Sequence, residues 1–114
     1  MHIDSYSFGS MTVDGKEYKE DLIVFKDKIK SNWWRREGHN LSLEDLTEVL
    51  NYKPDILIIG KGASGCMNVS EEIKKALEQR DIKVIAENTD KAYKIFNEKI
   101  KEGMDVVGAF HLTC

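Results

Sequence analysis

The sequence predicts a single α/β domain of three layers with an antiparallel β element at its front, and two observations support this fold class. Over residues 41–114, strand-like apolar runs alternate with amphipathic helix-like segments, the pattern of parallel strands joined by helical crossovers. Over residues 1–40, strand-like segments surround the tight-turn dipeptide Asp14-Gly15. The chain of 114 residues is long enough to bury one core. We therefore expect one domain over residues 1–114, with a β-rich front followed by an alternating α/β part.

The β-rich front is expected to hold a hairpin and a further strand. Its apolar residues stand at short intervals on both sides of Asp14-Gly15, as they do in the paired strands of a hairpin. The strand segments that this pattern predicts are Ile3–Phe8, Met11–Val13, Lys16–Tyr18 and Leu22–Phe25.

The alternating part begins with a helix and a buried strand. Ser42 with Asp45 resembles a capped helix start, and the apolar residues that follow fall on one helical face. Pro54 ends this segment, and the strand Asp55–Ile59 comes directly after it. Because this run is apolar at consecutive positions, we expect helices to cover both faces of its sheet.

Two further helices and two further strands complete the alternation. Ser70 is a suitable N-cap, and the acidic residues after it are favoured in a first helical turn. The next helix is expected to open at Thr89-Asp90 and to stop at Gly103, since glycine is common just beyond a helix end. The strands expected between and after these helices are Ile82–Ala86 and Val106–Leu112.

Composition and charge narrow the function classes. The formal net charge is −3, so the chain lacks the basic excess of a nucleic-acid-binding protein. Two cysteines do not make a disulfide framework and favour a reducing compartment. The first residues lack a signal-peptide pattern, and no apolar stretch approaches the roughly 20 residues that span a bilayer. We expect a cytoplasmic protein that binds neither nucleic acid nor membrane.

A glycine-rich loop, Gly60–Asn68, follows the buried strand, at the strand end where α/β sheets place their ligands. Its first six residues match G-x-G-x-x-G, and Glu87 stands near the position of the acidic residue in a dinucleotide fingerprint. However, that fingerprint needs a helix to open inside the loop, and the nearest cap, Ser70, comes after it. The glycines therefore favour a sharp, closely packed turn over a pocket for a small anion or small ligand, and a dinucleotide site is the least favoured of the three. The ligand-binding candidates for such a pocket are Gly60, Lys61, Gly62, Ser64 and Gly65.

Cys66 lies in the same loop and is the one catalytic candidate. A thiol in such a place can act as a nucleophile or a redox sensor when a base lies beside it. His39 and His111 are the candidate bases, and the sequence does not place either of them next to Cys66. The alternative is that Cys66 is a small packed apolar side chain.

The segment Trp33–His39, with the sequence Trp-Trp-Arg-Arg-Glu-Gly-His, is the densest aromatic and basic cluster of the chain. Neighbouring residues of an extended chain point to opposite sides, so one tryptophan can be buried while the other is exposed. An exposed tryptophan beside arginines is typical of a protein-binding hot spot. The alternative is that both tryptophans cap the core and the arginines are solvated. The partner-binding candidates are Trp33, Trp34, Arg35, Arg36 and His39.

The sequence ends on His111-Leu112-Thr113-Cys114. On an extended strand His111 and Cys114 point to opposite faces, which works against joint metal binding, and the chain has only three histidines and two cysteines in all. We expect no metal and no cofactor. The last strand is instead expected to be tied into the sheet.

Several motifs together resemble a small single-domain family that contains the adipogenesis-associated domain protein and, more distantly, a mitochondrial complex I assembly factor. In chain order they are Ile3–Met11, Trp33–His39, Leu57–Gly62 with the following loop, the helix around Thr89–Asn97, and Phe110–Cys114. The resemblance implies a three-layer fold on a mixed five-stranded sheet, with one strand antiparallel to the rest and a smaller β layer beside it. It implies no catalytic residues, and the better-described members act through protein partners.

We therefore predict a non-enzymatic module that binds a protein partner, as a scaffold or in assembly. The alternative is a protein that binds a small ligand or anion, or a cysteine-dependent enzyme, at Gly60–Asn68. The sequence does not name the partner. It also leaves open a homodimer through an exposed tryptophan or an uncovered front strand.

Overall fold

The computed structural model describes residues 1–114 and contains two β-sheets. Three strands form a small antiparallel sheet in the order β1-β2-β3, and their bounds are Ile3–Ser7, Ser10–Val13 and Lys16–Tyr18. Five strands form the central sheet in the order β5-β4-β8-β6-β7. These are β4 (Leu22–Val24), β5 (Ile29–Lys30), β6 (Ile56–Lys61), β7 (Lys83–Glu87) and β8 (Val106–His111).

Strand β4 alone runs antiparallel to the other strands of the central sheet. It pairs antiparallel with both β5 and β8, whereas β6 pairs parallel with both β7 and β8. The mixed five-stranded sheet with one antiparallel strand, which the family resemblance implied, is thereby confirmed. Since β4 and β5 come from the β-rich front, that part of the chain contributes to both sheets.

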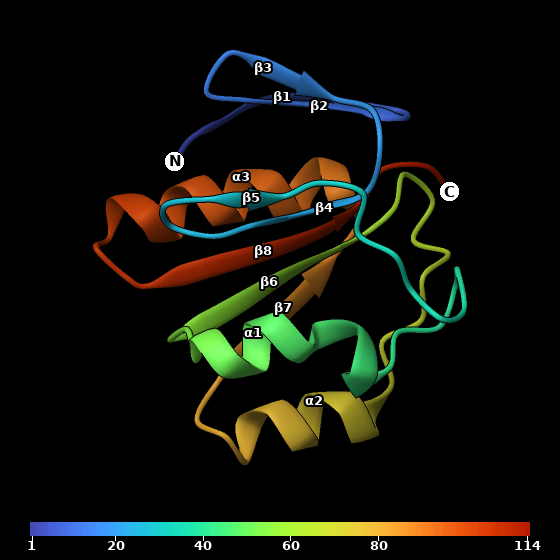
Figure 1. The fold of residues 1–114 in the computed structure, drawn as a ribbon, viewed down its shortest axis with the longest axis vertical. Coiled ribbons are helices and arrows are strands. Elements are labelled where there is room, and N and C mark those ends of the chain that lie inside the picture. Colours follow the sequence, from blue (N-terminus) through green and yellow to red (C-terminus); the bar gives the residue numbers. More distant parts are fainter.

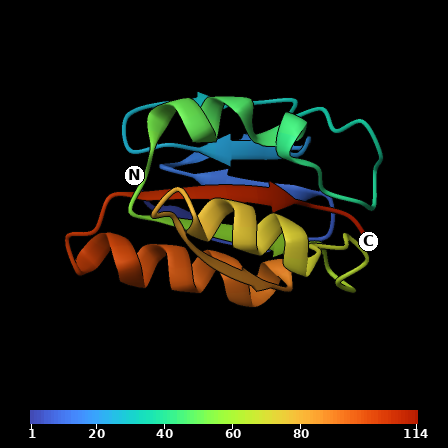
Figure 2. The ribbon, with the colours of Figure 1, turned by 90° about the horizontal axis from the view of Figure 1, so that it is seen from below.

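Helices lie on both faces of the central sheet. A 3-10 turn, Leu43–Leu46, leads into α1 (Thr47–Tyr52), and α2 (Glu71–Glu78) and α3 (Thr89–Lys101) follow. Figures 1 and 2 show α1 and α3 on opposite sides of the sheet, with the three-stranded sheet next to α3. These elements make up the three predicted layers.

The core consists of two clusters, one on each face of the central sheet. One cluster packs the apolar residues of α1 and α2 against the sheet, and the other packs those of α3 and the three-stranded sheet. Strand β6 serves both, because Leu57 and Ile59 belong to the first cluster and Ile56 and Ile58 to the second. Its continuous apolar sequence is thereby explained.

Local signals set several element ends as predicted. Ser70 caps α2, and its Oγ accepts the amide of Ile73 at 3.2 Å. Asp14 and Gly15, with φ angles of +46° and +82°, turn the chain between β2 and β3. Gly103 follows α3 with a φ angle of +81°.

The observed strand bounds differ from the predicted ones by one or two residues. Phe8, Phe25 and Leu112 lie just outside strands, and β6 continues to Lys61. The sequence does not predict β5, because its two residues are too few to show an alternation and only pairing with β4 makes them a strand. None of the helices is long and apolar enough to cross a membrane.

Candidate functional site

Four segments that are far apart in the sequence meet at one end of the central sheet, where β6 and β8 end (Figure 1). Residues 112–114, directly after β8, lie at the centre. Tyr6 Oη and the amide of Gly9 both donate to the carbonyl oxygen of Leu112, at 2.8 Å each. The amide of Ala63, in the glycine loop, donates to the carbonyl of Thr113 at 2.7 Å. The segment Trp33–His39 reaches the same place through the side chain of Arg35 and the carbonyl oxygen of His39.

Asp21, Arg35 and His111 form a buried polar cluster at this end. Asp21 Oδ2 lies 2.8 Å from Arg35 Nη1 and 2.8 Å from His111 Nδ1. The three side chains are 18%, 5% and 7% exposed. Arg35 also lies over the Trp33 ring, 4.7 Å from its centroid, and donates to the carbonyl of Gly38. The negative charge of Asp21 thus balances a guanidinium that is costly to bury alone.

The ring nitrogen His111 Nδ1 lies between two partners, Asp21 Oδ2 at 2.8 Å and Arg35 Nη2 at 3.0 Å. With a proton Nδ1 donates to Asp21, and without one it accepts from Arg35. Burial raises the pKa of Asp21, but hydrogen bonds from His111 and the Leu112 amide outweigh it, so its pKa lies below the ordinary value of 3.8. The other nitrogen, Nε2, is buried and has no hydrogen-bond partner.

His39 lies next to this cluster and is itself exposed. Its ring meets the ring of His111 edge to face, with the centroids 5.7 Å apart. Its carbonyl oxygen accepts the amide of Asn68 at 2.7 Å, which ties the segment Trp33–His39 to the glycine loop. No three His, Cys, Asp or Glu side chains lie close enough together to hold a metal ion.

Two glycines let the glycine loop pack against the end of β8. A Cβ on Gly60 would stand 2.7 Å from Thr89 Oγ1, and a Cβ on Gly62 would stand 2.6 Å from the carbonyl oxygen of Cys114. Gly62 also has a φ angle of +102°, which side chains rarely allow. Thr89 Oγ1 joins the loop to the strand, since it accepts the Gly62 amide at 2.9 Å and donates to the carbonyl of His111 at 2.6 Å.

The backbone amides of this loop already have acceptors. Ser64 and Cys66 both donate to the carbonyl oxygen of Cys114, at 3.2 and 3.0 Å, and Ala63 donates to Thr113. An anion bound to these amides would have to displace residues 113 and 114. Of the predicted ligand side chains, Lys61 is half-buried and Ser64 is exposed.

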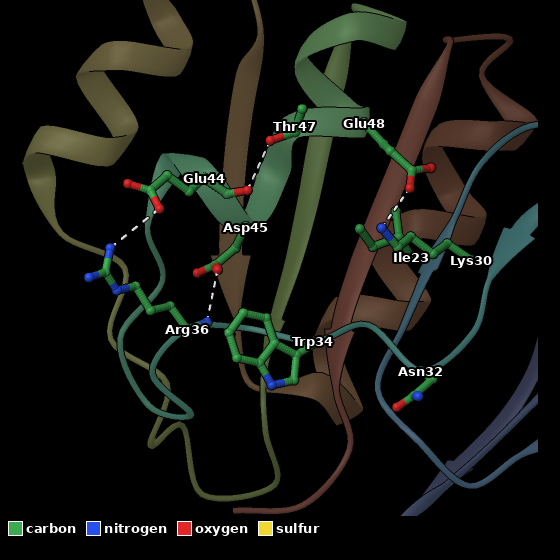
Figure 3. A pocket seen from close by; sticks show the side chains of 9 residues that line it. All are labelled: Ile23, Lys30, Asn32, Trp34, Arg36, Glu44, Asp45, Thr47 and Glu48. Atoms are coloured by element: carbon green, nitrogen blue, oxygen red, sulfur yellow. Dashed lines mark hydrogen bonds and ion pairs between the residues drawn. The ribbon is translucent and has the colours of Figure 1, made fainter.

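An exposed surface, here named the Trp34 surface, lies beside the buried cluster. It lines a hollow of about 660 Å³, and its residues are Ile23, Lys30, Asn32, Trp34, Arg36, Glu44, Asp45, Thr47 and Glu48. Figure 3 shows the indole of Trp34 between Arg36 on one side and Asn32 and Lys30 on the other. Two ion pairs border it, Arg36–Glu44 at 3.5 Å and Lys30–Glu48 at 2.6 Å. The surface therefore combines a large apolar ring with a polar border.

The predicted partner-binding residues divide between the interior and the surface. Trp33 and Arg35 are buried, whereas Trp34, Arg36 and His39 are exposed. The tryptophans thus point to opposite sides, as expected for an extended chain. The alternative of two core tryptophans beside two solvated arginines is wrong, because Arg35 is buried against Asp21 and Trp34 is 74% exposed.

Sequence patterns do not single out Asp21, the residue that joins the buried cluster. It follows Lys19 and Glu20 and so resembles an ordinary turn residue. The antiparallel register, with Leu22 opposite Phe110, is what brings Asp21 level with His111. That signal exists only once β4 and β8 are known to pair.

Taken together, these features define a class: a three-layer α/β domain whose last strand is held by a glycine loop and a buried Asp–Arg–His cluster. Residues 3–111 match the model of the family described as Protein of unknown function (DUF498/DUF598), and the chain belongs to that family. This is the family that the sequence motifs indicated.

Solved structures of similar proteins share the whole fold. The conserved hypothetical protein PH1505 from Pyrococcus horikoshii OT3 is 29% identical, with 100% of both chains covered and a TM-score of 0.82. A protein named MT938 is 28% identical over 99% of this chain and 98% of that one, with a TM-score of 0.76. A Mth938-like domain from Bordetella pertussis is 16% identical over 97% of this chain and 85% of that one, with a TM-score of 0.78, and supports the fold alone.

Proposed function

We propose that this chain is a protein-binding module of the scaffold or assembly type and that its partner contacts the Trp34 surface. The exposure of Trp34 carries the proposal. Trp34 is 74% exposed, although its neighbours in the chain, Trp33 and Arg35, are buried. Tryptophan and arginine are the residue types most enriched in binding hot spots, and here Arg36 borders the ring.

The residues on both sides of Trp34 are held by hydrogen bonds, which lowers the entropy cost of binding a partner. The Trp33 indole donates to the carbonyl of Asp45 at 2.9 Å, and the Arg36 amide donates to Asp45 Oδ1 at 3.0 Å. The backbone on both sides of Trp34 is therefore held before any partner arrives. Less conformational entropy is lost on association when a contact residue is positioned in advance. The ion pairs around the ring supply the polar rim of a typical interface.

The alternative, a small-ligand or cysteine-dependent site at Gly60–Asn68, has less support. A ligand on the loop amides would compete with Thr113 and Cys114 of the same chain. A protein partner at the Trp34 surface displaces no part of the chain.

Affinity capture from a native lysate tests the proposal with three baits: the wild-type chain, Trp34→Ala and Phe8→Ala. Phe8 is the matched control, because it is the other exposed large apolar residue, at 64% exposure. We expect a protein that wild type and Phe8→Ala retain and Trp34→Ala loses. With that protein purified, Trp34→Ala should weaken binding about 30-fold, the effect of removing a hot spot worth about 2 kcal/mol. Equal capture by all three baits would refute the assignment.

A further inference from the structure

Cys66 and Cys114 are neighbours in space although they are far apart in the sequence. The amide of Cys66 donates to the carbonyl oxygen of Cys114 at 3.0 Å. With standard backbone dimensions, such a bond places the two Cα atoms roughly 5–6 Å apart, within the range of about 4.4–6.8 Å that disulfides bridge. Both residues are exposed and both thiols are free. A small reagent in solution can therefore reach both residues.

The pair is held in this position by further contacts. Ser64 donates a second amide to the Cys114 carbonyl, and Ala63 donates to Thr113. Gly62 leaves space for Cys114 that a side chain would fill. The loop and the segment after β8 run side by side in both overall views (Figures 1 and 2). Much of the entropy cost of bringing the thiols together is thus met by the fold itself.

We propose that Cys66 and Cys114 form a reversible thiol–disulfide site that reacts with low-molecular-weight disulfides such as oxidised glutathione. The thiolate of one cysteine attacks the external disulfide, forming a mixed disulfide and releasing one small thiol. The thiolate of the other cysteine then attacks the protein sulfur of that mixed disulfide, closes the Cys66–Cys114 bond and releases a second small thiol. The protein gives up two electrons and two protons, and the external disulfide becomes two thiols.

This site is separate from the proposed partner surface. Neither cysteine lines the Trp34 hollow. Its effect would be local, since the bond joins the glycine loop to the segment after β8. Loss of partner binding in Trp34→Ala would therefore leave the redox proposal intact, and the reverse also holds.

Intact-mass analysis tests the proposal. The reduced chain is incubated with equal millimolar concentrations of oxidised and reduced glutathione, quenched in acid and alkylated. We expect both thiols to disappear together, with a mass loss of two hydrogens and no attached glutathione, and dithiothreitol should restore them. A chain that keeps glutathione on its cysteines without closing, or that keeps both thiols reduced, would overturn the proposal.

Three variants show whether the disulfide closes because Cys66 and Cys114 lie close together. Cys66→Ser and Cys114→Ser should each retain one glutathione, because no second thiol resolves the mixed disulfide. The double variant Cys66→Ser/Gln79→Cys still has two thiols, but they are far apart in the fold. Gln79 is exposed and directly follows α2, whose last residue, Glu78, borders a hollow with Asp55, just before β6, at the opposite end of that strand from the glycine loop. This double variant should bind two glutathiones, and ring closure as complete as that of wild type would contradict the geometric argument.

Discussion

At the scale of the residue, Asp21 is the side chain that makes the most contacts that hold the segments together at the end of β8. One of its oxygens meets Arg35 and His111, and the other accepts the amide of Leu112. Its carboxylate thus holds the Trp33–His39 segment and the segment after β8 at the same time. Without its charge, the guanidinium of Arg35 would be buried with no anion beside it. Removing one partner of a buried ion pair destabilises a protein by more than the intact pair stabilises it, because the other charge is left buried without a partner.

Asp21→Asn is therefore expected to lower the free energy of unfolding by about 3–5 kcal/mol at neutral pH, measured by urea denaturation. The pKa of Asp21 is lowered in the folded state, so its contribution is complete above its ordinary value of 3.8 and is lost as pH falls through the folded pKa. The stability gap between wild type and variant should accordingly shrink in acid.

The control is Glu98→Gln, which removes an exposed carboxylate on α3 and should change stability by less than about 0.5 kcal/mol. A gap between wild type and Asp21→Asn that stays constant from neutral pH into strong acid would show that the charge of Asp21 is not its source.

At the scale of the element, α2 depends on its N-cap. The helix has eight residues, which is too short to be stable alone, and of its own residues only Leu77 is fully buried. The Ser70 hydroxyl accepts the amide of Ile73 and so satisfies one of the free donors of the first turn. Because α2 follows the glycine loop, its first turn also fixes where that loop ends.

Ser70→Ala should destabilise the protein by about 1 kcal/mol, the usual cost of losing such a cap. Thermal or urea unfolding measures the loss. Ser7→Ala is the matched substitution, because Ser7 is exposed at the end of β1 and caps no helix. If both variants were equally stable, the hydroxyl of Ser70 would have no capping role.

At the scale of the whole molecule, four segments around residues 112–114 are expected to open together. Hydrogen bonds join them at the end of β8: Gly9 and Tyr6 donate to Leu112, Ala63 donates to Thr113, and Arg35 of the segment Trp33–His39 lies 3.0 Å from His111 Nδ1. Elements that share their contacts in this way tend to exchange their amide hydrogens as one unit.

Amide hydrogen exchange measures this coupling in Gly62→Ala. Gly62 has a φ angle of +102° and no room for a Cβ beside Cys114, so the variant should lift residues 113 and 114 from the loop. We expect faster exchange at Cys66 and also at Gly9, which is remote in the sequence.

Gly62→Ala has two costs, the strain of a side chain at a positive φ angle and the clash of its Cβ with Cys114, and Gly103→Ala separates them. Gly103 also has a positive φ angle, of +81°, but open space around it. This variant has only the strain of the positive φ angle, and its amide hydrogen exchange should become faster only near the end of α3. Faster exchange confined to the glycine loop in Gly62→Ala would contradict the coupling.

Much of the fold could be predicted from the sequence because its causes are local. A continuous apolar run marks β6, helical spacing of apolar residues marks the helices, and Ser70 and Asp14-Gly15 mark ends and turns. β5 could not be predicted, since two residues show no period. The candidate site was predicted in its parts, as a glycine loop, a tryptophan–arginine segment and a terminal motif, but not as one place.

By itself the sequence determined the class of fold, because spacing and turn chemistry act within a few neighbouring residues, and the resemblance of its motifs indicated the family. Only the tertiary structure decided that Arg35 is buried while Trp34 is exposed, that Asp21 joins Arg35 to His111, and that Cys66 meets Cys114. The bonds of Arg35 and Asp21 to His111 span 76 and 90 residues. Contacts at such separations are made by the pairing of β4 with β8 and by the packing of the loop on β8. Patterns within a few neighbouring residues do not predict either of these.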